Sequence, residues 1–197
     1  MNKNIEQIRR DVRERFERTA IDPAAERRFE TGAASALRLG YAAADLGVLP
    51  RSTVDSFAGV GNPFSLGEPS VGESVLDLGC GSGVDCLIAA RRVGASGRVI
   101  GLDMTRGQAE KAAWSARETG VAHVKILLAE AERIPLRGST IDLAISNGVW
   151  NLCPDKPRVI GELWRVLSPG GRVQMADILL DDATTPEEVA KKGAWSD

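Results

Sequence analysis

The sequence predicts an α/β fold in which a mainly parallel sheet carries helices on both faces. After residue 72, short apolar runs alternate with helical patterns, which is the order typical of a parallel sheet. The first run ends in a glycine-rich turn, Gly79-Cys80-Gly81-Ser82-Gly83, of the kind that joins a strand to a helix at a ligand site. The chain has 197 residues, 43% of them hydrophobic, which suffices for one core but not for two full domains.

The region before the sheet is predicted to be helical. Apolar residues recur at helical spacing over residues 4–20, between interleaved acids and arginines, so we expect an amphipathic helix that packs one stripe on the body. Asp22-Pro23 is typical of a helix start and predicts a second helix from Pro23 to about Leu37, followed by a short third helix over 42–46. The glycines and prolines between residues 59 and 72 predict an irregular loop over 50–73.

The sheet region is predicted element by element from its periodicity. Strands are expected over residues 74–78, 98–103, 124–128, 141–146 and 172–180. Helices are expected over residues 84–93, 106–119 and 157–167, with a turn at Pro169-Gly170-Gly171. Thr185-Pro186-Glu187-Glu188 is a capping box, which predicts a last helix running toward Trp195. We therefore divide the chain into a helical cap with a glycine-rich loop, residues 1–70, and a ligand-binding domain, residues 71–197.

Composition and charge exclude several classes of function. Lys and Arg total 25 against 27 Asp and Glu, a formal net charge of -2, so we expect no nucleic-acid partner. No apolar run approaches the roughly 18 residues of a membrane-spanning helix, and we expect a soluble, cytoplasmic protein without a membrane partner. Three cysteines without a CxxC pair and a single histidine, His123, predict neither a disulfide framework nor a metal site.

Acidic and amide side chains stand at the ends of the first four predicted strands. Asp77 precedes the glycine turn, where its charge would repel a pyrophosphate and favour a cation such as a ligand ammonium. Asp103 ends the second strand, where a carboxylate can accept hydrogen bonds from both hydroxyls of a ribose. Glu130 follows the third strand and could bind an adenine amino group, and Asn147 follows the fourth. These residues should meet at the carboxyl edge of the sheet.

These motifs resemble the class I S-adenosylmethionine-dependent methyltransferases. Asp77 with its glycine turn is similar to their first motif, Asp103 to their ribose-binding acid, Glu130-Ala131 to their adenine-binding pair, and Leu167-Ser168-Pro169-Gly170-Gly171 to the turn before their fifth strand. The resemblance implies a Rossmann-like methyltransferase sheet that binds S-adenosylmethionine and releases S-adenosylhomocysteine. It implies cofactor contacts from Asp77, Gly79, Cys80, Gly81, Asp103, Met104, Glu130, Ala131 and Asn147.

A narrower resemblance points to the arsenite methyltransferases and their relatives. It rests on Gly61-Asn62-Pro63, on Asp85-Cys86, on the segment 103–108 and on the segment 146–156. The arsenite enzymes carry thiolate ligands in these segments, whereas this chain has Val60 and Gly148 at two of those positions. Because As(III) needs soft thiolates, the differences argue against arsenite as the substrate. Cys86 is expected to face the core, and Cys80 to contact the cofactor through its backbone.

The function predicted is methyl transfer to a small molecule, such as a thiol, a metalloid or another soft nucleophile. The sulfonium donor is intrinsically reactive, so no general base is required and no catalytic residue is assigned. Candidate acceptor contacts are Tyr41, Asn62, Phe64 and Trp150, with the N-terminal helices as a lid by resemblance.

Three alternatives stay open at this point. The first is a non-catalytic domain that binds S-adenosylmethionine or S-adenosylhomocysteine, because little sequence follows the fifth strand where two antiparallel strands are usual in the family. The second is an arsenite methyltransferase whose further cysteines lie beyond residue 197. The third is a dinucleotide-dependent oxidoreductase, which Asp77 and Val84 disfavour because they depart from the dinucleotide motif.

Overall fold

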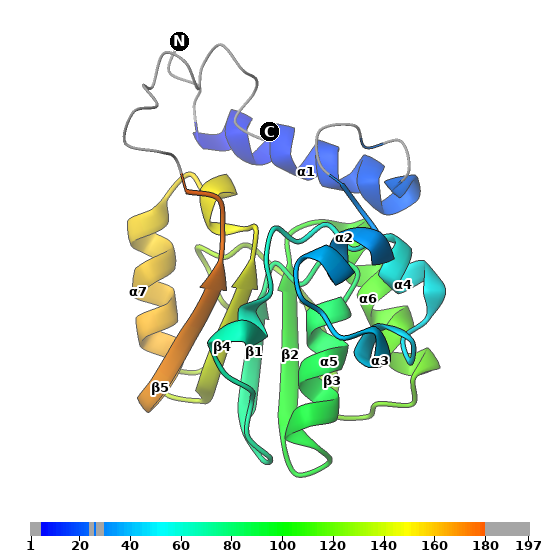
Figure 1. The fold of residues 1–197 in the computed structure, drawn as a ribbon. Helices are drawn as coiled ribbons and strands as arrows, with labels where there is room; N and C mark the ends of the chain where they lie inside the picture. The colour runs from blue at the N-terminus through cyan, green and yellow to red at the C-terminus, as the bar shows by residue number, and fades with distance from the viewer. Residues whose placement is uncertain (1–4, 24–25, 27–29, 180–197) are drawn as a thin grey trace.

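The computed structural model describes residues 5–23, 26 and 30–179 as one sheet with helices on both faces (Figure 1). The strands are β1 (Ser74–Leu78), β2 (Arg98–Asp103), β3 (Val124–Leu128), β4 (Ile141–Asn147) and β5 (Leu167–Ala176). They pair in parallel in the order β3-β2-β1-β4-β5. The chain thus runs outward from β1 in one direction and then returns to run outward in the other. The prediction of a parallel α/β fold is confirmed.

The register brings three predicted site residues to one edge. Leu78 at the end of β1 pairs with Leu102 on β2 and with Ser146 on β4. The residue after each of these, Gly79, Asp103 and Asn147, therefore lies at the carboxyl edge, where the order of the strands reverses. Ligands of open α/β sheets bind at such a reversal point.

Side-chain alternation along the strands gives the sheet two apolar faces. Val75 and Leu143 belong to the cluster that includes α5 (Val84–Val93), whereas Leu76 and Ala144 belong to the cluster that includes α7 (Lys156–Val166). The helix α6 (Arg106–Glu118) packs beside α5, against β2 and β3. Burial on both faces explains why the strands read as nearly continuous apolar runs. The three predicted helices of this region are confirmed within one or two residues.

The N-terminal helices cover the α5 face and the carboxyl edge. They are α1 (Ile5–Ile21), α2 (Ala33–Arg38), α3 (Ala43–Leu46) and α4 (Arg51–Asp55). In Figure 1, α1 runs across the end of the sheet to which the strand arrows point. Its strongest packing is on α6. The predicted first and third helices are confirmed. The first of them, α1, lies over the carboxyl edge of the sheet.

Two predictions for this region are wrong. A continuous helix from Pro23 to Leu37 does not form, because the chain is not helical at residues 30–31 and α2 begins only after Gly32. Gly32 has φ +87°, which a helical residue does not adopt, and it donates its N–H to the carbonyl of Phe57 instead of to a carbonyl within a helix. The segment 50–73 is not wholly irregular either. It contains α4, which precedes the first glycine of the loop, and a short 3-10 helix, η2 (Pro63–Leu66).

The fifth strand begins earlier and ends sooner than its predicted bounds of 172–180. Leu167 already pairs with Ile141, and the register shifts before Leu143 pairs with Arg172, so Pro169-Gly170-Gly171 forms a bulge within the strand. The strand ends at Ala176, opposite the last residue of β4, and the next side chain, Asp177, accepts the N–H of Trp150 at 2.7 Å. The capping box at residues 185–188 lies outside the described residues. No helix among the described residues is long and apolar enough to cross a membrane.

Candidate functional site

A cavity lies at the carboxyl edge of the sheet, at the reversal point between β1 and β4. Its wall combines the glycine turn, the ends of β2, β3 and β4, the segment 57–59 and one side of α1. Among the predicted cofactor residues, those that line it are Gly79, Cys80, Asp103, Met104, Ala131 and Asn147. Six of the nine predicted cofactor residues therefore share one cavity wall, whereas Asp77, Gly81 and Glu130 are not among its lining residues.

The glycine turn requires backbone that only glycine adopts readily. Gly79 has φ +72°, and a Cβ at this position would collide with the side chain of Val149. Asp103 then fixes the turn to β2, since its Oδ2 accepts the N–H of Gly81 at 2.9 Å and its Oδ1 accepts that of Thr105 at 2.8 Å. Burial raises the pKa of Asp103, while the two backbone hydrogen bonds oppose that rise.

Asp77 does not reach the cavity surface. Its side chain points to the α5 face of β1, where it is 2% exposed. Its Oδ2 has no hydrogen-bond partner among the described residues. Burial raises the pKa of Asp77 well above its ordinary value, and the nearby charge of Asp85 raises it further. In its ionised form, a carboxyl in this position would add negative potential to the cavity from behind its wall.

Asp85 is a cavity carboxylate that the sequence reasoning missed. It lies in the first turn of α5, directly after the glycine turn, and it lines the cavity although it is only 7% exposed. Its Oδ1 accepts the Tyr41 hydroxyl at 2.5 Å, and its Oδ2 accepts Asn147 Nδ2 at 3.1 Å. Burial raises the pKa of Asp85, and these two hydrogen bonds oppose the rise. Its position in the first helical turn after the glycines is the feature of the sequence that could have identified it as a site residue.

The helix α1 forms the roof of the cavity through Arg9, Val12 and Phe16. The Arg9 guanidinium lies 3.3 Å from Glu132 Oε1 and 3.6 Å from Glu130 Oε2. Arg13 adds a hydrogen bond of 3.0 Å to the other oxygen of Glu130. Glu130 therefore faces α1 outside the main cavity, whereas Glu132, which the sequence reasoning did not select, lines it.

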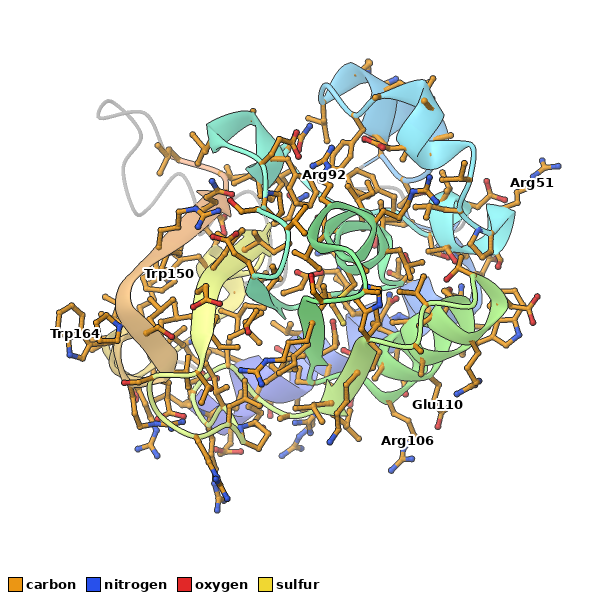
Figure 2. All side chains as sticks on the ribbon, turned by 90° about the horizontal axis from the view of Figure 1, so that it is seen from below. Arg51, Arg92, Arg106, Glu110, Trp150 and Trp164 are labelled. Carbon is orange, nitrogen blue, oxygen red and sulfur yellow. The ribbon has the colours of Figure 1, made fainter. Side chains whose placement is uncertain are left out.

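The four predicted acceptor contacts, Tyr41, Asn62, Phe64 and Trp150, have different surroundings in the structure. Tyr41 is not among the lining residues, but its hydroxyl donates to Asp85 and accepts Asn147 Nδ2 at 3.0 Å, and both of these residues line the cavity. Asn62 instead caps η2, its Oδ1 accepting the N–H of Phe64, and the Phe64 ring packs under Arg92 with 4.3 Å between the guanidinium carbon and the ring centroid. Trp150 packs on the α7-face cluster. Figure 2 shows Trp164 at the outer edge of the molecule and Trp150 nearer its middle. Asn62, Phe64 and Trp150 do not line the cavity.

The three cysteines are buried in different surroundings. Cys86 faces the core beside β2, as expected. Cys80 and Cys153 both line the cavity, and burial raises the pKa of the Cys153 thiol to about 12. His123 lies before β3 at the opposite edge, where its Nε2 contacts the carbonyl of Ala90 at 2.9 Å. Within the described ranges, no three His, Cys, Asp or Glu side chains are grouped so as to hold a metal ion.

Val60 and Gly148, where the resemblance to the arsenite enzymes would imply cysteines, adjoin each other here. A Cβ built on Gly148 would lie 3.3 Å from Cγ1 of Val60. Gly148 itself lines the cavity, so this contact lies at its β4 end. The wall at this point is apolar and offers no thiolate.

Comparison with known proteins gives one family and several relatives. The family model described as a methyltransferase domain matches residues 69–196 of this chain. An arsenite methyltransferase of Halobacterium salinarum is 40% identical over 160 residues, which is 81% of this chain and 40% of the relative. Aklanonic acid methyltransferase DauC of Streptomyces is 30% identical over 137 residues, 69% of this chain and 62% of that protein. The chain thus spans about two fifths of the length of the archaeal relative.

A similar crystal structure is that of an arsenic (III) S-adenosylmethionine methyltransferase from Chlamydomonas reinhardtii. It superimposes with a TM-score of 0.57 at 37% sequence identity, and the match covers 75% of this chain and 50% of the other.

Proposed function

Because the chain belongs to the methyltransferase domain family, we propose that it transfers the methyl group of S-adenosylmethionine to a small-molecule acceptor and releases S-adenosylhomocysteine. The family confirms the class I methyltransferase predicted from the sequence, and the relatives confirm its kinship with the arsenite methyltransferases. The observation that carries the proposal is the acid-lined cavity at the strand reversal, with the glycine turn on one side and Asp103 on the other.

The cavity's residues suit this cofactor. S-adenosylmethionine, when bound, supplies an electrophilic methyl group on a sulfonium. Asp103 stands where ribose hydroxyls would donate to it, and Ala131 with Glu132 would border the adenine, with Glu130 behind them. Arg9 pairs with Glu132 in the cavity wall, but Asp85 and Asp103 also line the cavity, and the buried, unpartnered Oδ2 of Asp77 lies behind it. This excess of negative charge favours a cationic ligand.

The protein's part in the reaction would be to exclude water and to align the acceptor. The roof helix α1 closes the cavity with Val12 and Phe16, which are apolar, and its arginines hold it to the end of β3. Asn147 and Gly148 border the β4 end, where the methyl group would face the acceptor. Alignment and desolvation supply much of the rate enhancement for a donor that is already reactive.

We propose a soft organic nucleophile such as a thiol as the acceptor. The apolar contact between Val60 and Gly148 lacks the thiolates that As(III) requires. DauC, whose name states aklanonic acid as its substrate, is a relative that acts on an organic molecule. Arsenite is the second candidate, because the relative of that name is 40% identical and because Cys80 and Cys153 line this cavity.

The test is calorimetric titration of the chain with S-adenosylmethionine, S-adenosylhomocysteine and NAD, followed by methyl-transfer assays on thiols and arsenite. Binding of both adenosyl ligands but not NAD, lost in Asp103→Ala, supports the cofactor site. Binding without turnover on any acceptor would favour the alternative of a non-catalytic adenosyl-ligand domain. Binding of NAD alone would overturn the proposal.

The remaining expectations extend this proposal to the whole chain. Residues 1–70 would serve as the cap of a methyltransferase domain over 71–197, which is supported by the contribution of α1 to the cavity roof. A small-molecule partner, the absence of a nucleic-acid partner and a cytoplasmic location stay predictions based on the net charge of -2 and on the apolar pattern.

A further inference from the structure

We propose that Asp85 is the carboxylate that receives the α-ammonium group of S-adenosylmethionine, and that Tyr41 and Asn147 are positioning residues that hold it. The inference rests on the proposed function and deepens it, since it assigns the aminoacyl end of the cofactor to a residue other than Asp77. Three features of the structure support it.

The first feature is that the hydrogen-bond donors to Asp85 are uncharged. They orient its carboxylate but bring no positive charge to it. Each oxygen of Asp85 accepts one hydrogen bond, from the Tyr41 hydroxyl at 2.5 Å and from Asn147 Nδ2 at 3.1 Å. Arg92 attracts Asp85 electrostatically, but its guanidinium is paired with Asp45 at 2.9 Å and with Glu68 at 2.6 Å. A buried carboxylate with neutral partners gains most from a ligand that brings its own positive charge.

The second feature is the repulsion between Asp85 and Asp77. Asp77 is fully enclosed, and the charge of Asp85 acts on it unfavourably. Its Oδ2 has no hydrogen-bond partner in the described part of the chain. A cation placed against Asp85 would stabilise both carboxylates, but only Asp85 lies in the cavity wall where a ligand can touch it.

The third feature is the direction in which the cofactor would extend. β1 lies between β2 and β4 in the sheet. With the ribose at Asp103 on β2, the aminoacyl end of the cofactor would extend across the end of β1 toward β4. Asn147 ends β4 and hydrogen-bonds directly to Asp85. Asp85 therefore lies at the β4 side of the cavity, where that end of the ligand would arrive.

Asn147 also links Asp85 to the loop that precedes β1. Its Oδ1 accepts the N–H groups of Val60 at 2.8 Å and Gly61 at 3.1 Å, and its Nδ2 donates to the Gly61 carbonyl at 2.9 Å. A Cβ on Gly59 would overlap the Asn147 amide. The orientation of the amide is thereby set by the loop, and the same amide positions Asp85.

The experiment compares two ligands that differ only at the aminoacyl end. S-adenosylhomocysteine carries the ammonium, whereas 5′-deoxy-5′-methylthioadenosine keeps the adenosine and the thioether but lacks the aminoacyl group. Calorimetry on the full chain should show that Asp85→Asn weakens S-adenosylhomocysteine by about 10- to 100-fold and leaves methylthioadenosine within about threefold of wild type. Asp103→Ala should weaken both ligands, and the surface variant Asp55→Asn should weaken neither.

A second variant tests the positioning role and guards against misfolding. Tyr41→Phe keeps the carboxylate and removes one donor, so it should weaken S-adenosylhomocysteine by about threefold to tenfold without affecting methylthioadenosine. A purely structural role for Tyr41 would weaken both ligands alike. This comparison stands even if Asp85→Asn does not fold.

Several results would overturn the assignment. These are an equal loss for both ligands in Asp85→Asn or in Tyr41→Phe, no loss in either variant, and a larger selective loss in Asp77→Asn than in Asp85→Asn. If the wild-type chain binds neither ligand, the proposed function itself fails. That outcome differs from wild-type binding that is insensitive to Asp85, which removes only this inference.

Discussion

The carboxylate of Asp103 accepts the backbone N–H of Gly81, with 2.9 Å between Oδ2 and the nitrogen. This hydrogen bond joins the end of β2 to the turn after β1, across the boundary between the two strands. The other carboxylate oxygen of Asp103, Oδ1, accepts the N–H of Thr105 at the start of α6. The residue that would bind the ribose therefore also shapes the turn that would contact the aminoacyl group.

Asp103→Ala removes the acceptor of two buried backbone amides. We expect the free energy of unfolding to fall by about 1–3 kcal/mol, because the amides lose partners that water replaces poorly. Urea denaturation measures this change. Asp103→Asn keeps one side-chain carbonyl oxygen as an acceptor and should lose less. Equal stabilities for the two variants would contradict the bridging role.

Arg9→Ala should loosen the roof of the cavity. Arg9 joins α1 to Glu132, whose side chain is only 7% exposed, so the ion pair is poorly screened by solvent. We expect S-adenosylhomocysteine to dissociate about tenfold faster, measured by stopped-flow mixing. The neighbouring variant Arg10→Ala changes an exposed side chain of the same helix and serves as the matched control. Equal dissociation rates in the two variants would remove the proposed role of the Arg9 pair.

Leu76→Ala should be among the most destabilising substitutions in the sheet. Leu76 lies at the centre of β1 with its side chain fully buried in the cluster that includes α7. Loss of a buried leucine in such a setting costs about 2–5 kcal/mol of unfolding free energy. Trp164→Ala removes a larger side chain from the same cluster's outer helix, but that side chain is 84% exposed, so the change should stay within about 0.5 kcal/mol. Chemical denaturation of both variants gives the comparison.

Stability should depend on pH through Asp77. Burial raises the pKa of this carboxyl, so the folded protein binds its proton more tightly than the unfolded chain, where the reference pKa is 3.8. Stability contributed by the protonated form is therefore lost as the pH rises above that value, because ionisation costs more in the folded state. Asp77→Asn removes this cost.

The melting temperature of Asp77→Asn minus that of the wild type should increase between about pH 4 and pH 7. Thermal unfolding followed by circular dichroism at several pH values measures the difference. A flat profile for Asp77→Asn would show that its carboxyl does not titrate differently in the folded state.

Local pattern in the sequence was enough to predict the elements of the sheet. The strands β1, β2 and β3 occupy their predicted bounds, and α5 does also, because each is a distinct apolar run or helical pattern, and β1 and α5 are closed by Gly79 and Gly94. The place of Asp103 and Asn147 at one edge follows from the same logic, since parallel strands end together. The start of α2 was not predictable in this way. It depends on a hydrogen bond from Gly32 to Phe57, a residue in the loop after α4.

The composition of the site depended on contacts between distant segments. Whether Asp77 or Asp85 lines the cavity is a question of which way each side chain points once the sheet and α5 are packed, and periodicity shows only that both are near the glycine turn. The pairing of Arg13 with Glu130 joins residues 117 positions apart. Local spacing predicts neighbours along one helix or strand, but pairs such as these exist only because tertiary packing brings separate elements together and removes their side chains from water.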